Sequence, residues 1–124
     1  MTDTDTSKEL VRAYYGLLQA GPDRFDADRL RVLLAPELDF EGPIAGHRIG
    51  AAPFLAGVCG FVAVVRGITL LRLLADGLEV AALYDAELPG GAVRFAEFFE
   101  VEDGRIRSLR LLYDATEYRA RGGG

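Results

Sequence analysis

The chain has 124 residues, half of them apolar, so it is long and hydrophobic enough to fold as one domain with a core. Its formal net charge of -5 and its scattered arginines disfavour nucleic-acid binding, which needs a basic patch. Cys59 is the only cysteine, which excludes an internal disulfide and a cysteine-based metal cluster, and we expect it to be a buried thiol. The acidic, polar N-terminal sequence is unlike a signal peptide, and no apolar run could span a bilayer. We therefore expect a cytoplasmic protein with no membrane partner.

The first predicted helix covers the stretch "TSKELVRAYYGLLQAGP". Thr6 or Ser7 can cap it, apolar residues follow at helical spacing, and Gly21-Pro22 ends it. A later stretch, "AAPFLAGVCGFVAVV", predicts another helix made of small residues that is apolar on nearly all sides. Such a helix is expected to be buried.

Between these two helices the sequence predicts a second helix and a short strand. The helix lies in "DADRLRVLLAPEL", where Asp26 or Asp28 is the N-cap and Pro36 the stop. A strand is expected over residues 38–41, followed by a turn rich in glycine and proline that carries His47, the only histidine.

Four strands are predicted in the second half of the chain, over residues 66–76, 78–88, 92–102 and 105–115. The turns between them are marked by three dipeptides that favour hairpins, Asp76-Gly77, Gly90-Gly91 and Asp103-Gly104. Helices followed by a run of antiparallel strands give an α+β order, in which the concave side of a curled sheet forms a pocket. Residues 1–124 are expected to form a single domain with flexible tails at residues 1–6 and 120–124.

One carboxylate interrupts the apolar face of the strand "AVRFAEFFEVE". Glu97 lies in the middle of the row formed by Val93, Phe95, Phe99 and Val101. With Gly90-Gly91 as a two-residue turn, Glu97 lies opposite Tyr84 on the face that the helices cover. This Glu97 is either a structural carboxylate tied to a tyrosine or a backbone amide, or a pocket acid whose apolar surroundings raise its pKa.

The next hairpin has two alternative registers. If Asp103-Gly104 is a two-residue turn, Arg110 lies opposite Glu97 and can pair with it. If the turn is one residue longer, the residues that share the face of Glu97 are Leu109, Leu111 and Tyr113, and Arg110 points outward. The second register is favoured because it gives an apolar inner row.

At this point the chain resembles a known family, the nuclear transport factor 2-like fold in its SnoaL-like, ketosteroid isomerase-like branch. The resemblance covers residues 7–118 and depends on "VRAYYGLLQAG", "LLAPELDFEGP" and "FFEVEDGRIRSLRLLYD". It implies an α+β, cystatin-like cone, in which a curled antiparallel or mixed sheet wraps around three N-terminal helices and encloses a pocket. Members of this fold serve many functions.

The resemblance also implies roles for particular residues. Ketosteroid isomerases use a tyrosine on the first helix and a protonated acid on the penultimate strand, and these positions correspond to Tyr14 and Glu97. The family's general base corresponds to Gly42, while Glu41, one residue earlier, points to the opposite face. The acids that related epoxide hydrolases and polyketide cyclases carry near Leu109 or Leu111 are also missing.

The candidate catalytic residues are therefore Glu97 as acid or hydrogen-bond donor, Tyr14, and His47 as a base at the pocket rim. Tyr15 is expected to be a packing or interface residue. No metal or other cofactor is implied, because a single histidine and scattered carboxylates show no ligand spacing. The expected substrate-binding residues are Tyr84, Phe95, Phe99, Leu109, Leu111, Tyr113, Phe40 and Phe54.

The function expected from these residues is acid–base chemistry on a small hydrophobic molecule: isomerisation, cyclisation, dehydration or epoxide opening. A catalytic member would be a cofactor-independent isomerase or a polyketide cyclase-like lyase. The alternatives are a non-catalytic domain that binds a hydrophobic ligand, and a dimeric interaction module. Leu83 and Phe98 are apolar but face away from the helices, so a homodimer through the convex sheet face is expected.

Overall fold

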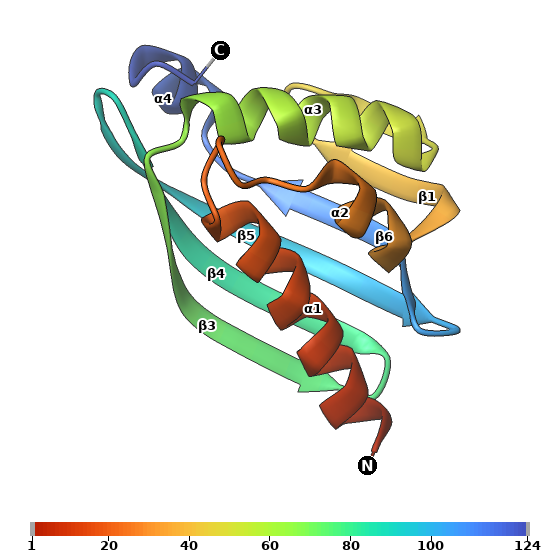
Figure 1. Ribbon diagram of the computed structural model, residues 1–124. Helices are drawn as coiled ribbons and strands as arrows, with labels where there is room; N and C mark the ends of the chain where they lie inside the picture. Colours follow the sequence, from red (N-terminus) through yellow and green to blue (C-terminus); the bar gives the residue numbers. More distant parts are fainter. Residues whose placement is uncertain (1, 124) are drawn as a thin grey trace.

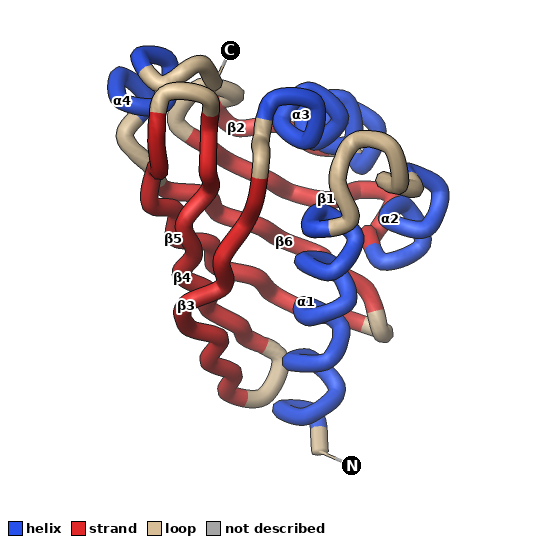
Figure 2. Tube along the Cα trace, turned by 60° about the vertical axis from the view of Figure 1, so that its left-hand side comes forward, coloured by secondary structure: helices blue, strands red, loops and turns tan. Residues whose placement is uncertain are grey.

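The structure, a computed structural model, describes residues 2–123 and has the expected α+β class. One mixed sheet has the strand order β2-β1-β6-β5-β4-β3, and it curls without closing (Figure 1). Figure 2 shows the two layers, with the strands on one side and α1, α2 and α3 on the other. The elements are α1 (Asp3–Gln19), α2 (Ala27–Leu33), β1 (Leu34–Gly42), β2 (Gly46–Ile49), α3 (Ala51–Val64), β3 (Gly67–Asp76), β4 (Glu79–Leu88), β5 (Gly91–Glu102), β6 (Arg105–Leu112) and α4 (Ala115–Ala120).

The first helix, α1, begins one turn earlier than predicted. Its N-cap is Thr2, whose side chain accepts a hydrogen bond from the Asp5 amide, so neither Thr6 nor Ser7 is the cap. Two aspartates in the first turn complement the positive end of the helix dipole. Residues 3–6 are therefore helical, where a flexible tail was expected. The buried side of α1 packs on β3 and β4 and carries Val11, Tyr14, Tyr15 and Leu18.

The second helix, α2, is capped by Asp26 as predicted, because its carboxylate accepts from the Arg29 amide at 3.1 Å. The strand that follows is longer than predicted and begins at Leu34. Pro36 therefore lies inside β1, which is paired on both sides. It is tolerated because the β1–β6 register is interrupted between Leu34 and Asp39, where the ladder does not need the missing N–H.

The third helix, α3, is only half buried, so the prediction of a buried helix was wrong. Its sheet-facing side carries Ala51, Phe54, Leu55, Val58 and Val62, and this side packs against β1. The exposed side consists of small residues such as Ala52 and Ala63, each of which exposes little apolar surface. Cys59 lies on that side and is exposed, contrary to the expected buried thiol.

The β4–β5 hairpin keeps the predicted faces but not the predicted pairing. Leu88 pairs with Gly91, so Ala82, not Tyr84, lies opposite Glu97. The turn is therefore shifted by one residue, and Tyr84 instead pairs with Phe95. A shift of two residues in the pairing leaves every side chain on its original face, since side chains alternate along a strand.

The β5–β6 hairpin has the shorter turn, since Glu102 pairs with Arg105 across Asp103-Gly104, but a bulge beside the turn shifts the later pairs by one residue into the favoured inner row. The register is interrupted between Glu100 and Val101, and Asp103 adopts a positive φ of 52° beside Gly104. Leu111 lies opposite Glu97 and Leu109 opposite Phe99 on the inner face. Arg110 lies opposite Phe98 and points outward.

The C-terminal segment forms a fourth helix that the sequence analysis missed. The Asp114 carboxylate caps α4 by accepting from the Glu117 amide at 2.9 Å, and Tyr118 packs edge-on against Phe95. The Gly90 amide then donates to the Arg121 carbonyl at 2.9 Å. Residues 120–123 are thus held against the β4–β5 turn, where a flexible tail was expected.

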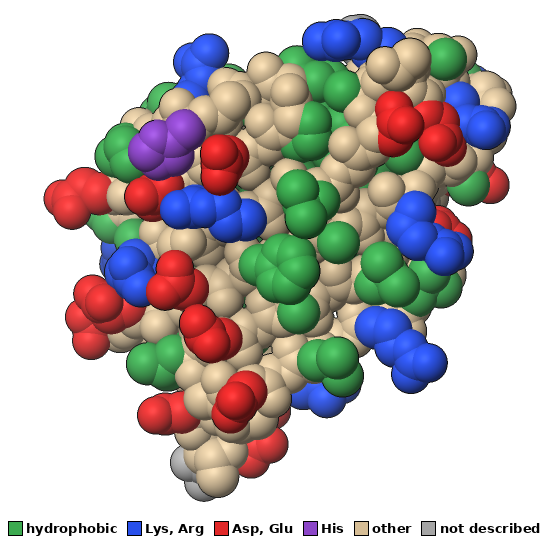
Figure 3. Space-filling model, turned by 180° about the vertical axis from the view of Figure 1, so that it is seen from behind, with side chains coloured by type: hydrophobic (Ala, Val, Ile, Leu, Met, Phe, Trp, Pro, Cys, Tyr) green, Lys and Arg blue, Asp and Glu red, His purple; other side chains and the backbone are tan. Residues whose placement is uncertain are grey.

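The outer face of the sheet carries an apolar patch among ion pairs (Figure 3). Phe98 on β5 is 49% exposed and Leu112 on β6 is 58% exposed. Leu83, on the neighbouring strand β4, is half-buried. Among residues 2–123, no helix is long and apolar enough to cross a membrane.

Candidate functional site

A cavity of about 560 Å³ lies between the concave face of the sheet and helices α1 and α3. The β1–β2 turn and the C-terminal segment form part of its wall. Apolar side chains make up most of the lining, and the predicted binding residues that contribute to it are Phe40, Phe54, Tyr84, Phe95, Leu109, Leu111 and Tyr113.

Glu97 lies in the wall of this cavity and is almost completely buried, with 1% of its surface exposed. The Tyr15 hydroxyl donates a hydrogen bond to Glu97 Oε1 at 2.6 Å. Burial raises the pKa of Glu97 from 4.5 to about 7, although the hydroxyls of Tyr15, Tyr84 and Tyr14 act in the opposite direction by stabilising the carboxylate. Within residues 2–123 Glu97 takes part in no ion pair, so no positive charge offsets its burial and the pKa rises despite the three hydroxyls.

Three tyrosines surround this carboxyl group, two from α1 and one from β4. Burial, followed by the nearby Glu97, raises the pKa of Tyr14, Tyr15 and Tyr84, so each remains a neutral hydroxyl donor. The ring of Tyr84 stacks on Phe95 with centroids 5.0 Å apart. Rings packed in this way fix the positions of the hydroxyl groups.

The contact made by Tyr15 differs from the expected packing or interface role. Its ring is buried, 5.0 Å from that of Tyr14, and its hydroxyl makes the short bond to Glu97. Tyr14 and Glu97 contribute to the cavity wall and Tyr15 does not. The sequence shows two adjacent tyrosines, but it does not show which of the two hydroxyls forms a hydrogen bond with Glu97.

Phe99 does not reach the cavity, although it was expected to bind substrate. It is 1% exposed and its ring lies edge-on to both Tyr14 and Tyr15, at centroid distances of 5.5 and 6.0 Å. Phe99 therefore supports the two tyrosines from beneath and belongs to the core.

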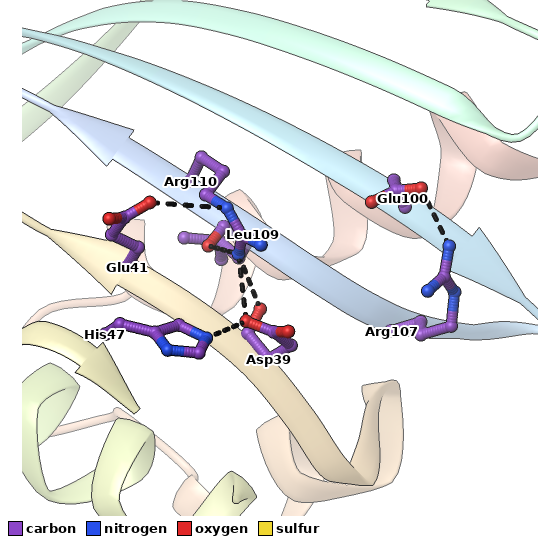
Figure 4. A network of polar contacts seen from close by, with 7 residues as sticks. All are labelled: Asp39, Glu41, His47, Glu100, Arg107, Leu109 and Arg110. Atoms are coloured by element: carbon purple, nitrogen blue, oxygen red, sulfur yellow. Dashed lines mark hydrogen bonds and ion pairs between the residues drawn. The ribbon is translucent and has the colours of Figure 1, made fainter. Parts of the chain in front are cut away.

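His47 lies outside the cavity, because the segment expected to be a turn forms the strand β2. It pairs with Glu41 in the β1–β2 ladder, on the outer face of the sheet. Its Nε2 contacts Asp39 Oδ1 at 2.7 Å, and the same carboxylate accepts from Arg110 at 3.1 Å (Figure 4). In this position His47 cannot act as a base on a molecule in the cavity.

Gly42, which the resemblance matches to the family's general base, has no side chain that could take this role. Gly42 lines the cavity, and a Cβ built there would lie 3.7 Å from the Leu111 Cβ, an ordinary contact. The Glu41 carboxylate lies 3.5 Å from Arg110 Nε on the outer side (Figure 4). Glu41 also contributes to the cavity lining, but its carboxylate pairs with Arg110, so Glu97 is the carboxyl group that the described cavity offers to a bound molecule.

Sequence analysis also missed Arg48, which contributes to the cavity wall. Recognising "GHRI" as a strand paired with β1 would have placed it on the inner face. As for metals, residues 2–123 contain no group of three or more histidine, cysteine or acidic side chains arranged to hold an ion.

Solved structures similar to this chain share its fold. A candidate ketosteroid isomerase from Kribbella flavida is 26% identical, with a TM-score of 0.79 over 92% of this chain and 82% of that one. A candidate polyketide cyclase from Xanthomonas campestris is 21% identical, with a TM-score of 0.76 over 97% and 98%. An LEH-like epoxide hydrolase from M. tuberculosis is 23% identical, with a TM-score of 0.72 over 94% and 89%.

Comparison with curated proteins finds no match. The sequence model of the SnoaL-like domain matches residues 11–109, a range that contains the second half of α1 with its tyrosine pair, the whole of β5 with Glu97, and most of the cavity wall. The chain therefore belongs to the SnoaL-like domain family, within the nuclear transport factor 2-like fold.

Proposed function

We propose that the cavity binds a small hydrophobic molecule with a carbonyl or similar oxygen, and that protonated Glu97 donates a hydrogen bond to that oxygen. The observation that carries this proposal is the carboxyl group itself, which is buried in an apolar cavity wall with a pKa raised to about 7. A carboxylic acid in such a place is a hydrogen-bond donor at or below neutral pH.

Tyr15 supports the proposal because it fixes the orientation of the acid. Its hydroxyl donates to Oε1 from outside the cavity wall, which leaves Oε2 as the oxygen that carries the proton toward the bound molecule. Tyr14 and Tyr84 contribute to the wall near the same group and can orient the ligand's oxygen as further donors.

In the catalytic form of this proposal, Glu97 stabilises negative charge that develops on the substrate oxygen, or transfers its proton to it. The remaining carboxylate keeps the hydrogen bond from Tyr15. Isomerisation, cyclisation and dehydration of a carbonyl compound all pass through such an oxyanion or enol. Two of the similar structures are named as a candidate ketosteroid isomerase and a candidate polyketide cyclase, which are reactions of this kind. A third is named as an epoxide hydrolase, and an acid would assist that reaction by donating its proton to the epoxide oxygen.

A non-catalytic binding domain is the second candidate, and one observation favours it. The base position holds Gly42, and His47 lies on the outer face bound to Asp39. Carbon acid chemistry needs a base within reach of the substrate. If the protein is a non-catalytic binding domain, Glu97 and the tyrosines select a ligand with an acceptor oxygen, and no proton is transferred.

The test measures binding of 2-acetylnaphthalene, a fused-ring ketone whose oxygen can only accept, by calorimetry at pH 5.5 and pH 8.5. The wild type should bind about tenfold more tightly at pH 5.5, because the ionised acid cannot donate. Glu97→Gln keeps a donor and should bind equally at both pH values. Glu87→Gln, the same change at an exposed position on β4, is the control and should behave as the wild type. A wild-type affinity that does not depend on pH would refute the donor role.

Assembly is a separate part of the proposal. We propose that two copies pair through the outer face of the sheet, which exposes a central apolar patch (Figure 3). Phe98→Asp should convert the dimer to a monomer in sedimentation velocity, whereas Val32→Asp, at an exposed apolar residue on α2, should not. A wild type that is monomeric at micromolar concentration would refute it. The patch consists of Leu71, Leu74, Leu83, Phe98 and Leu112.

A further inference from the structure

The β1–β2 ladder places Arg48 on the inner face of the sheet. Arg48 pairs directly with Phe40, and paired residues share a face. Phe40 is buried and lines the cavity, and Arg48 lines the same cavity. The neighbouring residue His47 pairs with Glu41 and points outward, as the alternation of the strand requires.

The hydrogen-bond partners of Arg48 distinguish it from the other cations at this end of the sheet. On the outer face, His47 and Arg110 both contact the Asp39 carboxylate, and Arg110 also lies near Glu41 (Figure 4). Arg48 takes part in no ion pair within residues 2–123; its Nε donates to the Ala45 carbonyl at 3.2 Å. Its Nη1 and Nη2 groups make no hydrogen bond to residues 2–123 and remain as donors at the cavity rim.

Arg48 and Glu97 lie at different ends of the cavity. In the strand order β2-β1-β6-β5, three strand spacings separate them. Spacings of about 4.8 Å give on the order of 14 Å between the two backbones, and both side chains extend inward to shorten the gap. The wall between them is formed by Phe40, Leu109 and Leu111.

We propose that Arg48 binds an anionic group, a carboxylate in chemical class, at the end of the ligand that lies opposite its Glu97-bound oxygen. This inference rests on the proposed function, because it assumes a molecule in the cavity. It narrows the ligand to an elongated one, with an apolar ring body, an acceptor oxygen at one end and a carboxylate at the other.

The charges of the molecule support this pairing. The chain has a net charge of -5, so an anion is repelled in general and needs a specific cation at the site. A guanidinium presents two parallel N–H groups that match a carboxylate. Held at both ends, the ligand can enter in one direction only, with its neutral oxygen deepest.

The test compares two ligands that differ only in the anion, 2-acetylnaphthalene and 6-acetyl-2-naphthoate, by calorimetry at pH 5.5 and low salt. The wild type should bind the acid about tenfold more tightly than the ketone, and added salt should reduce this preference. Arg48→Gln should abolish the preference, which is the ratio of the two affinities and so cancels any change of the cavity wall that both ligands share. Arg48→Lys should keep part of it. Arg12→Gln, which removes an exposed charge from α1, is the control and should keep all of it.

The outcomes separate the two proposals. If both ligands bind equally, or if Arg48→Gln keeps the preference, the role of Arg48 is wrong while the donor role of Glu97 stands. If the acid alone binds and depends on Arg48 but not on Glu97, anion recognition is supported and the proposed function fails. If neither ligand binds, both proposals are refuted for this class of molecule.

Discussion

The pH dependence of stability should carry a signature of Glu97 that Glu97→Gln removes. In the unfolded chain this carboxyl group titrates near 4.5, and in the folded protein its pKa is about 7. Below pH 4.5 the group is protonated in both states and contributes no difference. As the pH rises toward 7 the unfolded chain releases the proton while the folded protein retains it, so stability falls, and above 7 the penalty is constant.

The size of the penalty follows from the two pKa values. Each pKa unit corresponds to about 1.4 kcal/mol, so raising the pKa from 4.5 to about 7 removes about 3 kcal/mol from the free energy of unfolding at pH 8. The side chain is 1% exposed, so solvent screening does not reduce this value much. Gln does not titrate and keeps an oxygen that can accept from Tyr15.

The assay is urea unfolding of the wild type, Glu97→Gln and Glu87→Gln at pH 4.5, 6, 7 and 8. The difference in unfolding free energy between the wild type and Glu97→Gln should change by about 3 kcal/mol in favour of Gln between pH 4.5 and pH 8. Glu87→Gln, on an exposed part of β4, should track the wild type. A change below about 0.5 kcal/mol would show that water enters the cavity and solvates the carboxylate. A change of opposite sign would mean that the tyrosines hold an ionised Glu97.

The other predictions concern the surroundings of this acid. Tyr15→Phe should raise the pKa of Glu97 further, because it removes a donor that stabilises the carboxylate; carbon-detected NMR titration measures this, and an unchanged or lower value would contradict it. Phe99→Ala should reduce the unfolding free energy, measured in urea, by about 3–5 kcal/mol, because Phe99 is buried in the core. Phe98→Ala should reduce it by less than about 1 kcal/mol, because Phe98 is half exposed. Equal losses would show that the two faces of β5 have been assigned the wrong way round. Gly42→Asp should fold and speed the isomerisation of a β,γ-unsaturated cyclic ketone at least about tenfold, followed by absorbance; no gain in a folded variant would favour the binding function.

The inner face of β5 could be predicted because it depends on alternation alone. Glu97 and Phe95 share a face in any register, and the two-residue error in the β4–β5 pairing did not move either of them. The outward position of Arg110 followed from choosing the apolar inner row, which the structure reaches by a bulge beside the two-residue turn and not by the longer turn. The error in register affected only the residue expected opposite Glu97, which is Ala82 and not Tyr84.

The contact between Tyr15 and Glu97 could not be predicted in this way. Tyr14 and Tyr15 point in directions about 100° apart on α1, and both are buried because the helix lies against the sheet on one side and α2 on the other. Which hydroxyl meets the acid depends on the rotation of α1 about its own axis, and that rotation is set by packing on β3 and β4.

The positions of His47 and Arg48 were decided by the formation of β2. The segment is rich in glycine and its four strand residues are exposed, so no hydrophobic pattern marks it as a strand. Pairing with β1 then places His47 outside with Asp39 and Arg48 inside with Phe40.

The sequence by itself determined the elements that a local period encodes: the order of the three N-terminal helices, the four long strands, and the face on which Glu97 lies. The tertiary structure decided what depends on residues far apart in the chain. The raised pKa of Glu97 is one example, since the side chains of α1 and β4 exclude water from a strand that begins about seventy residues after α1 ends. The exposed side of α3 and the docking of α4 on the β4–β5 turn are others, because burial is a property of the space between elements and a segment's own composition does not fix it.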